Sequence, residues 1–260
     1  MTKKIYFLKS NFFNHREVMY GFFSRKGGVS SKPFNTLNCS RSTKDLKKNI
    51  NKNIKLALNT LNFLDKDLVI GNQYHSKKVV IIDEKFNFNK IYKADGFVTQ
   101  SKNTIIGILT ADCAPIFFYD PIRKIIAAAH AGWKGCLKNI CSSVIKSMNK
   151  LGSINEDIES IIGPCIDIKN YEVSKDLYLK FCTKNMQYKK FFIKKSNNKY
   201  LFNLAKALKY QLVELNIKKV ILNNEDTYNN YQKYYSHRRS SIHGEKETGR
   251  MINIIGFLRK

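Results

Sequence analysis

Two apolar runs joined by a short polar turn constrain the fold of this chain more than any other feature. Residues 115–119 and 124–129 have the composition of strands, and residues 120–123 between them (Asp-Pro-Ile-Arg) have that of a tight turn. A hairpin makes its two strands antiparallel, which argues against a purely parallel, doubly wound sheet. We therefore expect an α+β fold, with residues 1–260 forming a single layered domain of mixed β-sheet and flanking helices.

The spacing of apolar residues predicts the remaining elements. A helix is expected over 42–61, with Ser42 or Thr43 as its N-cap, because apolar residues recur there at helical spacing. The other expected helices cover residues 133–151, 174–183 and 201–215. Strands are expected near residues 68–73, 79–83, 105–110, 115–119, 124–129, 158–162, 219–223 and 251–258.

Composition restricts the class of protein. A hydrophobic fraction of 43%, with 17 Phe and 14 Tyr, is typical of a globular chain and not of a disordered one. No apolar run approaches the ~20 residues that cross a bilayer, so no membrane association is expected. The six cysteines form no paired framework, which favours reduced thiols and a cytoplasmic location. The oligomeric state cannot be predicted.

The net charge of +26 does not by itself predict nucleic-acid binding. Lysines are scattered along the whole chain and form no dense block of the kind that interaction tails show. Lysine and asparagine are both unusually frequent. Both are encoded by A/T-rich codons, so the base composition of the genome explains their excess without any function. We expect no specific nucleic-acid partner, although a field of this sign favours anionic substrates such as phosphate.

Three residues that can bind a metal each follow closely on an apolar, strand-like run: His75, Cys113 and His130. Chemistry in open sheets is found at strand ends, so these side chains can converge in one cleft. Two imidazoles and a thiolate are a zinc ligand set, and three protein ligands leave a fourth position open, as in catalytic sites. The spacing lacks the compact CxxC or HExxH pattern. A buried thiol with two ordinary histidines therefore remains the alternative.

Seven short segments give the chain a resemblance to a known family. In order they are FSRKGGVS (23–30), NQYH (72–75), ADG (94–96), TADC (110–113), HAGW (130–133), IGPC (162–165) and TGRM (248–251). The chain resembles, over almost its whole length, the bacterial laccase-like proteins. These are also named multicopper polyphenol oxidases or peptidoglycan editing factors, and they are regarded as zinc-dependent purine nucleoside phosphorylases. Tyr74 and Lys134 depart from the residues that the family often has there.

The resemblance implies a layered fold and phosphorolysis of adenosine, inosine and S-methyl-5'-thioadenosine, with adenosine deamination as a further activity. Purine nucleosides and phosphate are then the partners. The family's zinc ligands match His75, Cys113 and His130, and its pocket-lining segment places Asn38 near the substrate.

Further site residues are expected from their chemistry. Only eight arginines occur, and the guanidinium fork suits phosphate oxygens. Arg25 lies beside Gly27-Gly28, whose backbone N–H groups can form an anion-binding nest, and we count it as catalytic. The C-terminal arginines expected to contact phosphate or ribose are Arg238, Arg239 and Arg250. Each of these four arginines can equally be a surface or structural residue.

A role at the site is expected for one acidic residue and a role in a turn for another. Asp112 adjoins the thiolate of Cys113, and it is expected to orient a ligand imidazole or to act as a base, with turn capping as the alternative. Asp95 in Ala-Asp-Gly is read as a turn residue.

Two other enzyme classes use the same residues. A copper-dependent polyphenol oxidase is disfavoured, because five histidines in the chain cannot supply a trinuclear copper centre. A metal-independent cysteine hydrolase acting on peptidoglycan-related amides, with Cys113 as nucleophile and a histidine as base, remains the alternative.

Overall fold

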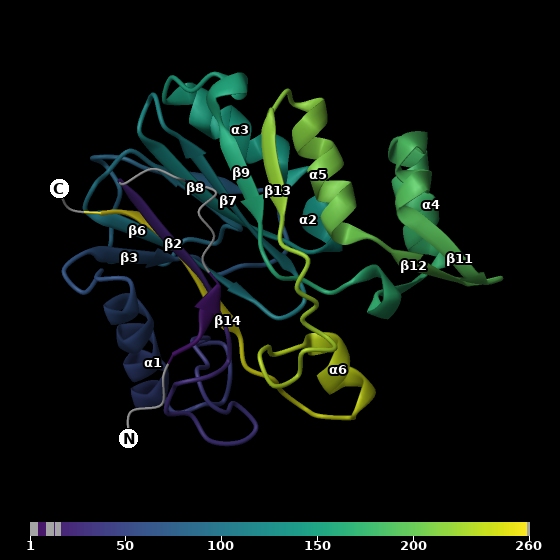
Figure 1. The fold of residues 1–260 in the computed structure, drawn as a ribbon, viewed down its shortest axis with the longest axis horizontal. Coiled ribbons are helices and arrows are strands. Elements are labelled where there is room, and N and C mark those ends of the chain that lie inside the picture. The colour runs from purple at the N-terminus through teal and green to yellow at the C-terminus, as the bar shows by residue number, and fades with distance from the viewer. Residues whose placement is uncertain (1–4, 9–12, 14–16, 259–260) are drawn as a thin grey trace.

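Two β-sheets packed face to face form the centre of the molecule, and helices cover both outer sides (Figure 1). The structure is a computed structural model that describes residues 5–8, 13 and 17–258. The larger sheet has the strand order β13 (Lys219–Leu222), β9 (Glu159–Ile162), β7 (Ala114–Asp120), β8 (Ile125–Ala131), β5 (Gly96–Thr99) and β4 (Val79–Ile82). The second sheet has the order β1 (Phe7–Leu8), β2 (Val18–Phe23), β14 (Met251–Phe257), β6 (Thr104–Thr110) and β3 (Asp67–Ile70).

Both sheets are mixed, as the sequence predicts. The hairpin of β7 and β8 is antiparallel, with Ile116 opposite Ala129. Parallel pairs lie at the edges, where β3 pairs with β6, β4 with β5 and β13 with β9. Aromatic side chains fill the space between the sheets, and the rings of Phe22 and Phe117 stack with centroids 4.7 Å apart. This burial of large apolar surface is the main force that joins the two sheets.

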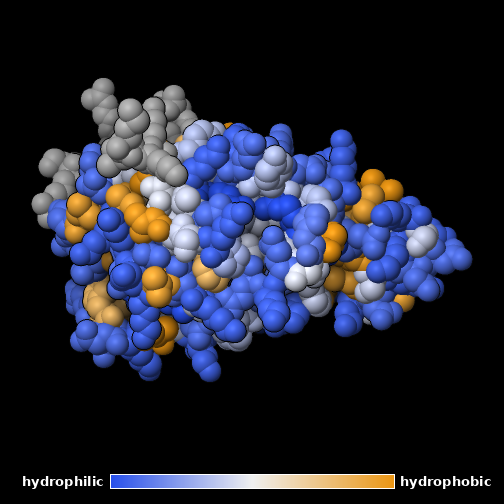
Figure 2. Space-filling view, turned by 90° about the horizontal axis from the view of Figure 1, so that it is seen from below, coloured by the Kyte–Doolittle hydropathy of each residue, from blue (hydrophilic) through white to orange (hydrophobic). Residues whose placement is uncertain are grey.

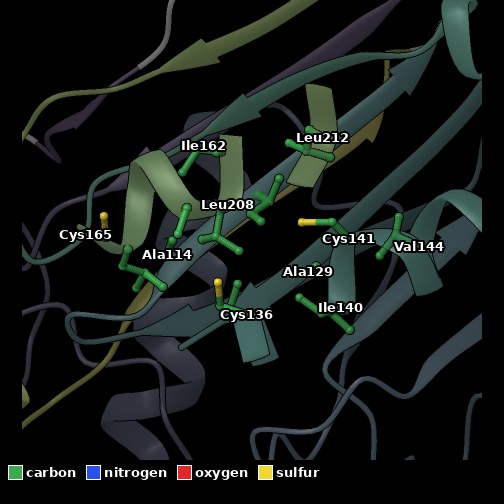
Figure 3. Packing of buried hydrophobic residues seen from close by; sticks show 14 of the residues in the cluster. Ala114, Ala129, Cys136, Ile140, Cys141, Val144, Ile162, Cys165, Leu208 and Leu212 are labelled. Carbon is green, nitrogen blue, oxygen red and sulfur yellow. The ribbon is translucent and has the colours of Figure 1, made fainter. Parts of the chain in front are cut away.

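Helices bury the outer faces of the sheets. Helix α1 (Lys47–Thr60) covers the five-stranded sheet through Ile50, Ile54 and Leu58. The six-stranded sheet is covered by α2 (Trp133–Leu137), α3 (Ile140–Lys150) and α5 (Leu204–Glu214). Figure 3 shows side chains of these helices directed at the sheet, with Cys136, Cys141 and Leu208 among them. These cysteines are buried and unpaired.

A third, three-stranded sheet projects from this body, at the right of Figure 1. It contains β10 (Glu172–Ser174), β12 (Lys199–Phe202) and β11 (Phe192–Ser196), and α4 (Lys175–Lys184) packs beside it. A short helix α6 (His237–Ile242) precedes β14. The face in Figure 2 is mainly hydrophilic, with hydrophobic side chains exposed in small separate groups.

Three of the four predicted helices have different limits in the structure. Helix α1 begins at Lys47, so Ser42 and Thr43 are not its N-cap. Their segment forms a loop in which Thr43 donates to the carbonyl of Ser40 and accepts from Asn38. Helix 133–151 is two helices, and helix 201–215 begins only at Leu204, because residues 199–202 form β12. The helix predicted over 174–183 and the eight predicted strands are confirmed within a few residues.

None of the helices in the described part of the chain combines the length and the apolar character that a membrane-spanning helix requires.

Candidate metal centre

The three predicted metal ligands converge where the chain crosses between the two large sheets. Cys113 lies between β6 of one sheet and β7 of the other, His130 lies in β8, and His75 lies in the loop after β3. The ligand atoms of the three residues all lie within 4.8 Å of one another, and Cys113 Sγ is 3.8 Å from His75 Nε2. Zinc binds sulfur at about 2.3 Å and imidazole nitrogen at about 2.0 Å. The 3.8 Å between Cys113 Sγ and His75 Nε2 is short enough for both atoms to bind one such ion, and the three residues together form a candidate metal site.

Asp95 holds both ligand histidines in place. Its carboxylate contacts His130 Nδ1 at 2.8 Å and accepts from the backbone N–H of His75 at 3.1 Å. The backbone N–H and the hydroxyl of Ser76 also donate to it, each at 2.7 Å. Because Nδ1 of His130 contacts Asp95, its Nε2 is left for a metal; metal-binding histidines typically contact a carboxylate or carbonyl through the other ring nitrogen in this way. Asp95 lies at a bend before β5, as predicted, but its contacts with both histidines were not predicted.

Local backbone geometry at the site is strained or tightly packed. His75 and Asp112 both adopt left-handed backbone conformations, with φ of 61° and 82°, and such strain is often found at functional sites. Gly132, at the start of α2, leaves room for the ligands. A Cβ there would lie 2.7 Å from Cys113 Sγ and 3.1 Å from His75 Cδ2, so only glycine fits without displacing a ligand.

The electrostatics favour a thiolate in the cluster. Burial raises the pKa of the Cys113 thiol, but the charge of His130 and hydrogen bonds from both histidines outweigh burial and lower it to about 6. Burial lowers the pKa of His130, but Cys113 and Asp95 raise it to about 9. For the Asp95 carboxyl, burial raises the pKa, and hydrogen bonds from His130 and Ser76 lower it to about 2. The negative charges of the Cys113 thiolate and the Asp95 carboxylate therefore favour a cation at this site.

A pocket of about 300 Å³, here called the metal pocket, opens over this cluster. Besides the three ligands it is lined largely by polar residues, among them Ser42, Gln73, His237 and Arg250. Arg250 donates through Nη1 to the carbonyls of Thr248 and Gly249. In the described part of the chain its other guanidinium N–H groups have no hydrogen-bond partner, so they can bind an anion.

Asp112 lies next to Cys113 in the sequence, but its carboxylate points elsewhere. It accepts from the hydroxyls of Thr227 and Ser236 and from the backbone N–H of Arg238. These contacts join the Cys113 loop to the N-terminus of α6. The carboxylate that contacts a ligand imidazole is that of Asp95.

Three predicted arginines do not line the metal pocket. Arg25 donates to the carbonyl and side chain of Asn35 and lies 4.4 Å above the ring of Tyr235. The expected anion nest beside it is occupied, because the N–H of Gly28 donates to Thr36 Oγ1. Arg238 donates to the carbonyl of Glu172. Arg239 donates to the carbonyls of Thr227, Tyr228 and Tyr234.

Asn38 supports the pocket from behind. It is fully buried, donates to Thr43 and Asp45, and accepts from the backbone N–H of Arg250. It therefore fixes Arg250 and the loop that contributes Ser40 and Ser42 to the pocket.

Sequence reasoning missed Gln73, although it lies inside the NQYH segment. Its side chain accepts from the N–H of Leu109 and donates to the carbonyl of the same residue, both at 2.8 Å. Gln73 thereby ties the His75 loop to β6, whose end leads to Cys113. The signal was its position two residues before a ligand, but glutamine is common at loop surfaces.

The chain is similar to known proteins over most of its length. The family model described as multi-copper polyphenol oxidoreductase laccase matches residues 19–258. A Rickettsia prowazekii protein named purine nucleoside phosphorylase is 35% identical over 227 residues, 87% of this chain and 90% of that protein. The Bacillus subtilis purine nucleoside phosphorylase YlmD is 30% identical over 265 residues, 94% of this chain and 90% of that protein.

The fold of the chain also matches a solved structure. The crystal structure of the hypothetical protein YfiH of Bacillus licheniformis has a TM-score of 0.86 at 29% identity and covers 93% of each chain. Sequence, fold and the His-Cys-His cluster lead to one conclusion: the chain belongs to the family described as multi-copper polyphenol oxidoreductase laccase, whose curated relatives are named purine nucleoside phosphorylases.

Proposed function

We propose that this protein is a zinc-dependent purine nucleoside phosphorylase acting on adenosine, inosine and S-methyl-5'-thioadenosine. The observation that carries the proposal is the convergence of His75, Cys113 and His130 beneath a polar pocket that also contains Arg250. The names of the curated relatives support the reaction class. A mixed imidazole and thiolate set suits zinc, and a copper oxidase centre needs more histidines than the site holds.

In phosphorolysis a phosphate oxygen forms a bond to the anomeric carbon of ribose, while the bond from that carbon to the purine nitrogen breaks. The free guanidinium N–H groups of Arg250 would hold the phosphate, because charge-assisted hydrogen bonds to its oxygens are strong. His237 lines the same pocket and would supply a proton to the departing purine. Zinc, when bound, supplies a positive charge that polarises an oxygen or a water.

Metal content and phosphate-dependent release of adenine from adenosine test the proposal together. The wild-type protein should contain about one zinc per chain, and Cys113→Ala should lose both the zinc and the activity. Cys182→Ala is the matched control, because Cys182 is a thiol on α4 outside the cluster. Arg250→Ala should keep the zinc and raise KM for phosphate about tenfold, as expected for the loss of hydrogen bonds to a charged group. Well-folded protein without metal, active after chelation, would contradict the proposal.

Adenosine deamination is a further activity proposed for the same pocket. Formation of inosine from adenosine without phosphate, lost in Cys113→Ala, would be its signature. Its absence would restrict the enzyme to phosphorolysis.

A cysteine hydrolase is the second candidate, because one feature of the site favours it. Cys113 contacts His130, and His130 contacts Asp95, as a nucleophile, a base and an orienting carboxylate do. A chelator separates the two: it should abolish a zinc phosphorylase and leave a thiol hydrolase active.

A further inference from the structure

The carboxylate of Asp112 fastens the loop that carries Cys113 to the start of α6. It accepts from the hydroxyl of Ser236 at 2.9 Å and from the backbone N–H of Arg238 at 2.6 Å. A third bond comes from the hydroxyl of Thr227 at 2.8 Å. One side chain thus joins its own loop to residues that lie between 115 and 126 positions away in the sequence.

Asp112 occupies a position that few residue types tolerate. Its φ of 82° lies in the left-handed region, where aspartate and asparagine are accepted more readily than most other side chains. The residue is also buried, and a buried carboxylate is costly unless hydrogen bonds compensate for the lost water. Strain of this kind is often stored at functional sites, so the contacts of Asp112 point to a role beyond packing.

The residue that follows His237 is held at both of its ends. The backbone N–H of Arg238 donates to Asp112. Its guanidinium donates to the carbonyl of Glu172 at 2.8 Å and lies 5.4 Å from the ring centroid of Tyr171. Arg238 therefore joins the Cys113 loop to the first strand of the third sheet.

The residue that precedes His237 is held as well. Ser236 is fully buried, and its hydroxyl donates to Asp112 and accepts from the N–H of Arg239. His237 itself is exposed and lines the metal pocket. Its imidazole makes no hydrogen bond to any other residue that the structure describes. The backbone at His237 is thus fixed on both sides, while the side chain is free to meet a substrate.

We propose that Asp112 is a positioning residue: it fixes His237 at the edge of the metal pocket, where the imidazole can protonate the departing purine. The proposal rests on the phosphorolysis proposed above, in which His237 donates that proton. Asp112 acts through His237 and takes no part in the transfer itself. Phosphate binding by Arg250 does not depend on Asp112, because the backbone N–H of Arg250 is held by Asn38.

Two buried hydroxyls that donate to the same carboxylate provide a matched pair of variants. Ser236→Ala removes the contact beside His237, and Thr227→Val removes the contact that lies away from it. Ser236→Ala should lower kcat for adenosine about tenfold, because a small misplacement of a reacting group slows the reaction strongly. KM for phosphate and zinc content should not change, and Thr227→Val should retain the wild-type kcat. Equal losses in the two variants would contradict the proposal.

A double variant shows whether the effect passes through His237. Ser236→Ala combined with His237→Ala should be no slower than His237→Ala alone, because residues that act through one another do not give additive losses. A merely structural role of Ser236 would give losses that add, and such a result would overturn the proposal.

Two substitutions at Asp112 separate positioning from proton transfer. Asparagine and glycine both tolerate the left-handed backbone. Asp112→Asn keeps an oxygen for Ser236 and Arg238, and its amide can donate to the hydroxyl of Thr227, so it should retain most of the activity. Asp112→Gly loses all three contacts and should lower kcat about tenfold or more. Equal losses in both variants would mean that Asp112 acts as a base, which the proposal excludes.

Hydrogen exchange of the α6 amides, followed by mass spectrometry, tests the same contacts without turnover. Residues 238–242 should exchange faster in Asp112→Gly and Ser236→Ala than in the wild type and in Thr227→Val. Unchanged exchange in Asp112→Gly and Ser236→Ala would reject the positioning role, whatever the activity. Faster exchange in a protein that lacks phosphorolysis would reject the proposed function, and it would limit Asp112 to holding α6 in place.

Discussion

At the scale of the residue, Gly132 leaves the space that the metal cluster needs, because it has no Cβ. Its φ of −84° and ψ of −175° suit alanine equally well, so any effect of Gly132→Ala comes from the added Cβ. That atom would lie 2.7 Å from Cys113 Sγ. We expect Gly132→Ala to weaken zinc binding by about tenfold or more, comparable to the loss of a ligand's supporting contacts, measured by competition with a chromogenic chelator.

Gly135→Ala is the control for this prediction. A Cβ at Gly135 would make ordinary contacts of 3.5 Å and 3.6 Å, and the residue lies three positions later, within α2. Equal zinc affinity in Gly132→Ala and the wild type would show that the Cys113 loop can move away from the added carbon.

The protonation of His130 predicts how zinc affinity depends on pH. Zinc requires the thiolate of Cys113 and neutral His130. With a pKa of about 6, Cys113 has already lost its proton at pH 7, whereas His130, with a pKa of about 9, must release one on binding. Between these values the Kd for zinc should fall about tenfold for each unit of pH, and it should level off above pH 9.

Calorimetry in two buffers of different ionisation enthalpy measures this proton directly. About one proton should be released per zinc from these two residues at pH 7.5. Binding that is independent of pH between 6 and 9 would mean that His130 is neutral before zinc arrives.

At the scale of the element, the break between α2 and α3 depends on Asn139. It adopts a left-handed conformation with φ and ψ of 60°, and its side chain accepts from the N–H of Ser142. Asn139→Ala loses this cap, and alanine tolerates the left-handed region less well than asparagine, whose side chain can hydrogen-bond locally there, so the substitution should lower the free energy of unfolding by about 2 kcal/mol. Urea unfolding measures the change.

Asn139→Gly separates the two causes. Glycine removes the cap but tolerates the left-handed backbone, so the loss should be smaller than for alanine. Equal losses would assign the whole effect to the cap.

The same break shows why sequence reasoning predicted one helix over 133–151. Apolar residues continue at helical spacing on both sides of it, at Leu137, Ile140 and Val144, so the hydrophobic pattern carries no sign of the interruption. The strands of the third sheet were missed for the opposite reason. In β11 all residues after Phe192 are exposed, and without a buried face the alternation that marks a strand is absent.

The convergence of His75, Cys113 and His130 could be predicted because each lies in, or a few residues after, a mainly apolar strand: His130 in β8, Cys113 after β6 and His75 in the loop after β3. The arginines could not be sorted in this way. Arg25 and Arg239 are held by backbone carbonyls of segments brought near by folding, such as those of Asn35 and Tyr234. A carbonyl partner leaves no mark on the sequence, so a structural arginine and one that binds phosphate look alike until the chain is folded.

At the scale of the whole molecule, the candidate metal centre lies where the two large sheets meet. His75 follows β3 of the five-stranded sheet, and His130 lies in β8 of the six-stranded sheet. Cys113 lies between β6 and β7, where the chain passes from one sheet to the other. A ligand that binds the folded state and not the unfolded one stabilises it by about 4 kcal/mol at a thousandfold excess over Kd. Removal of zinc should therefore lower the Tm of the entire molecule.

Thermal unfolding with and without a chelator tests this coupling. For a chain of this length a loss of about 4 kcal/mol corresponds to a fall in Tm of roughly 8 °C or more. Cys113→Ser should unfold at the same temperature with and without the chelator, because it lacks the thiolate ligand. A wild-type transition that splits in two on chelation, with only the smaller part shifted, would show that the metal stabilises one sheet and not the junction between them.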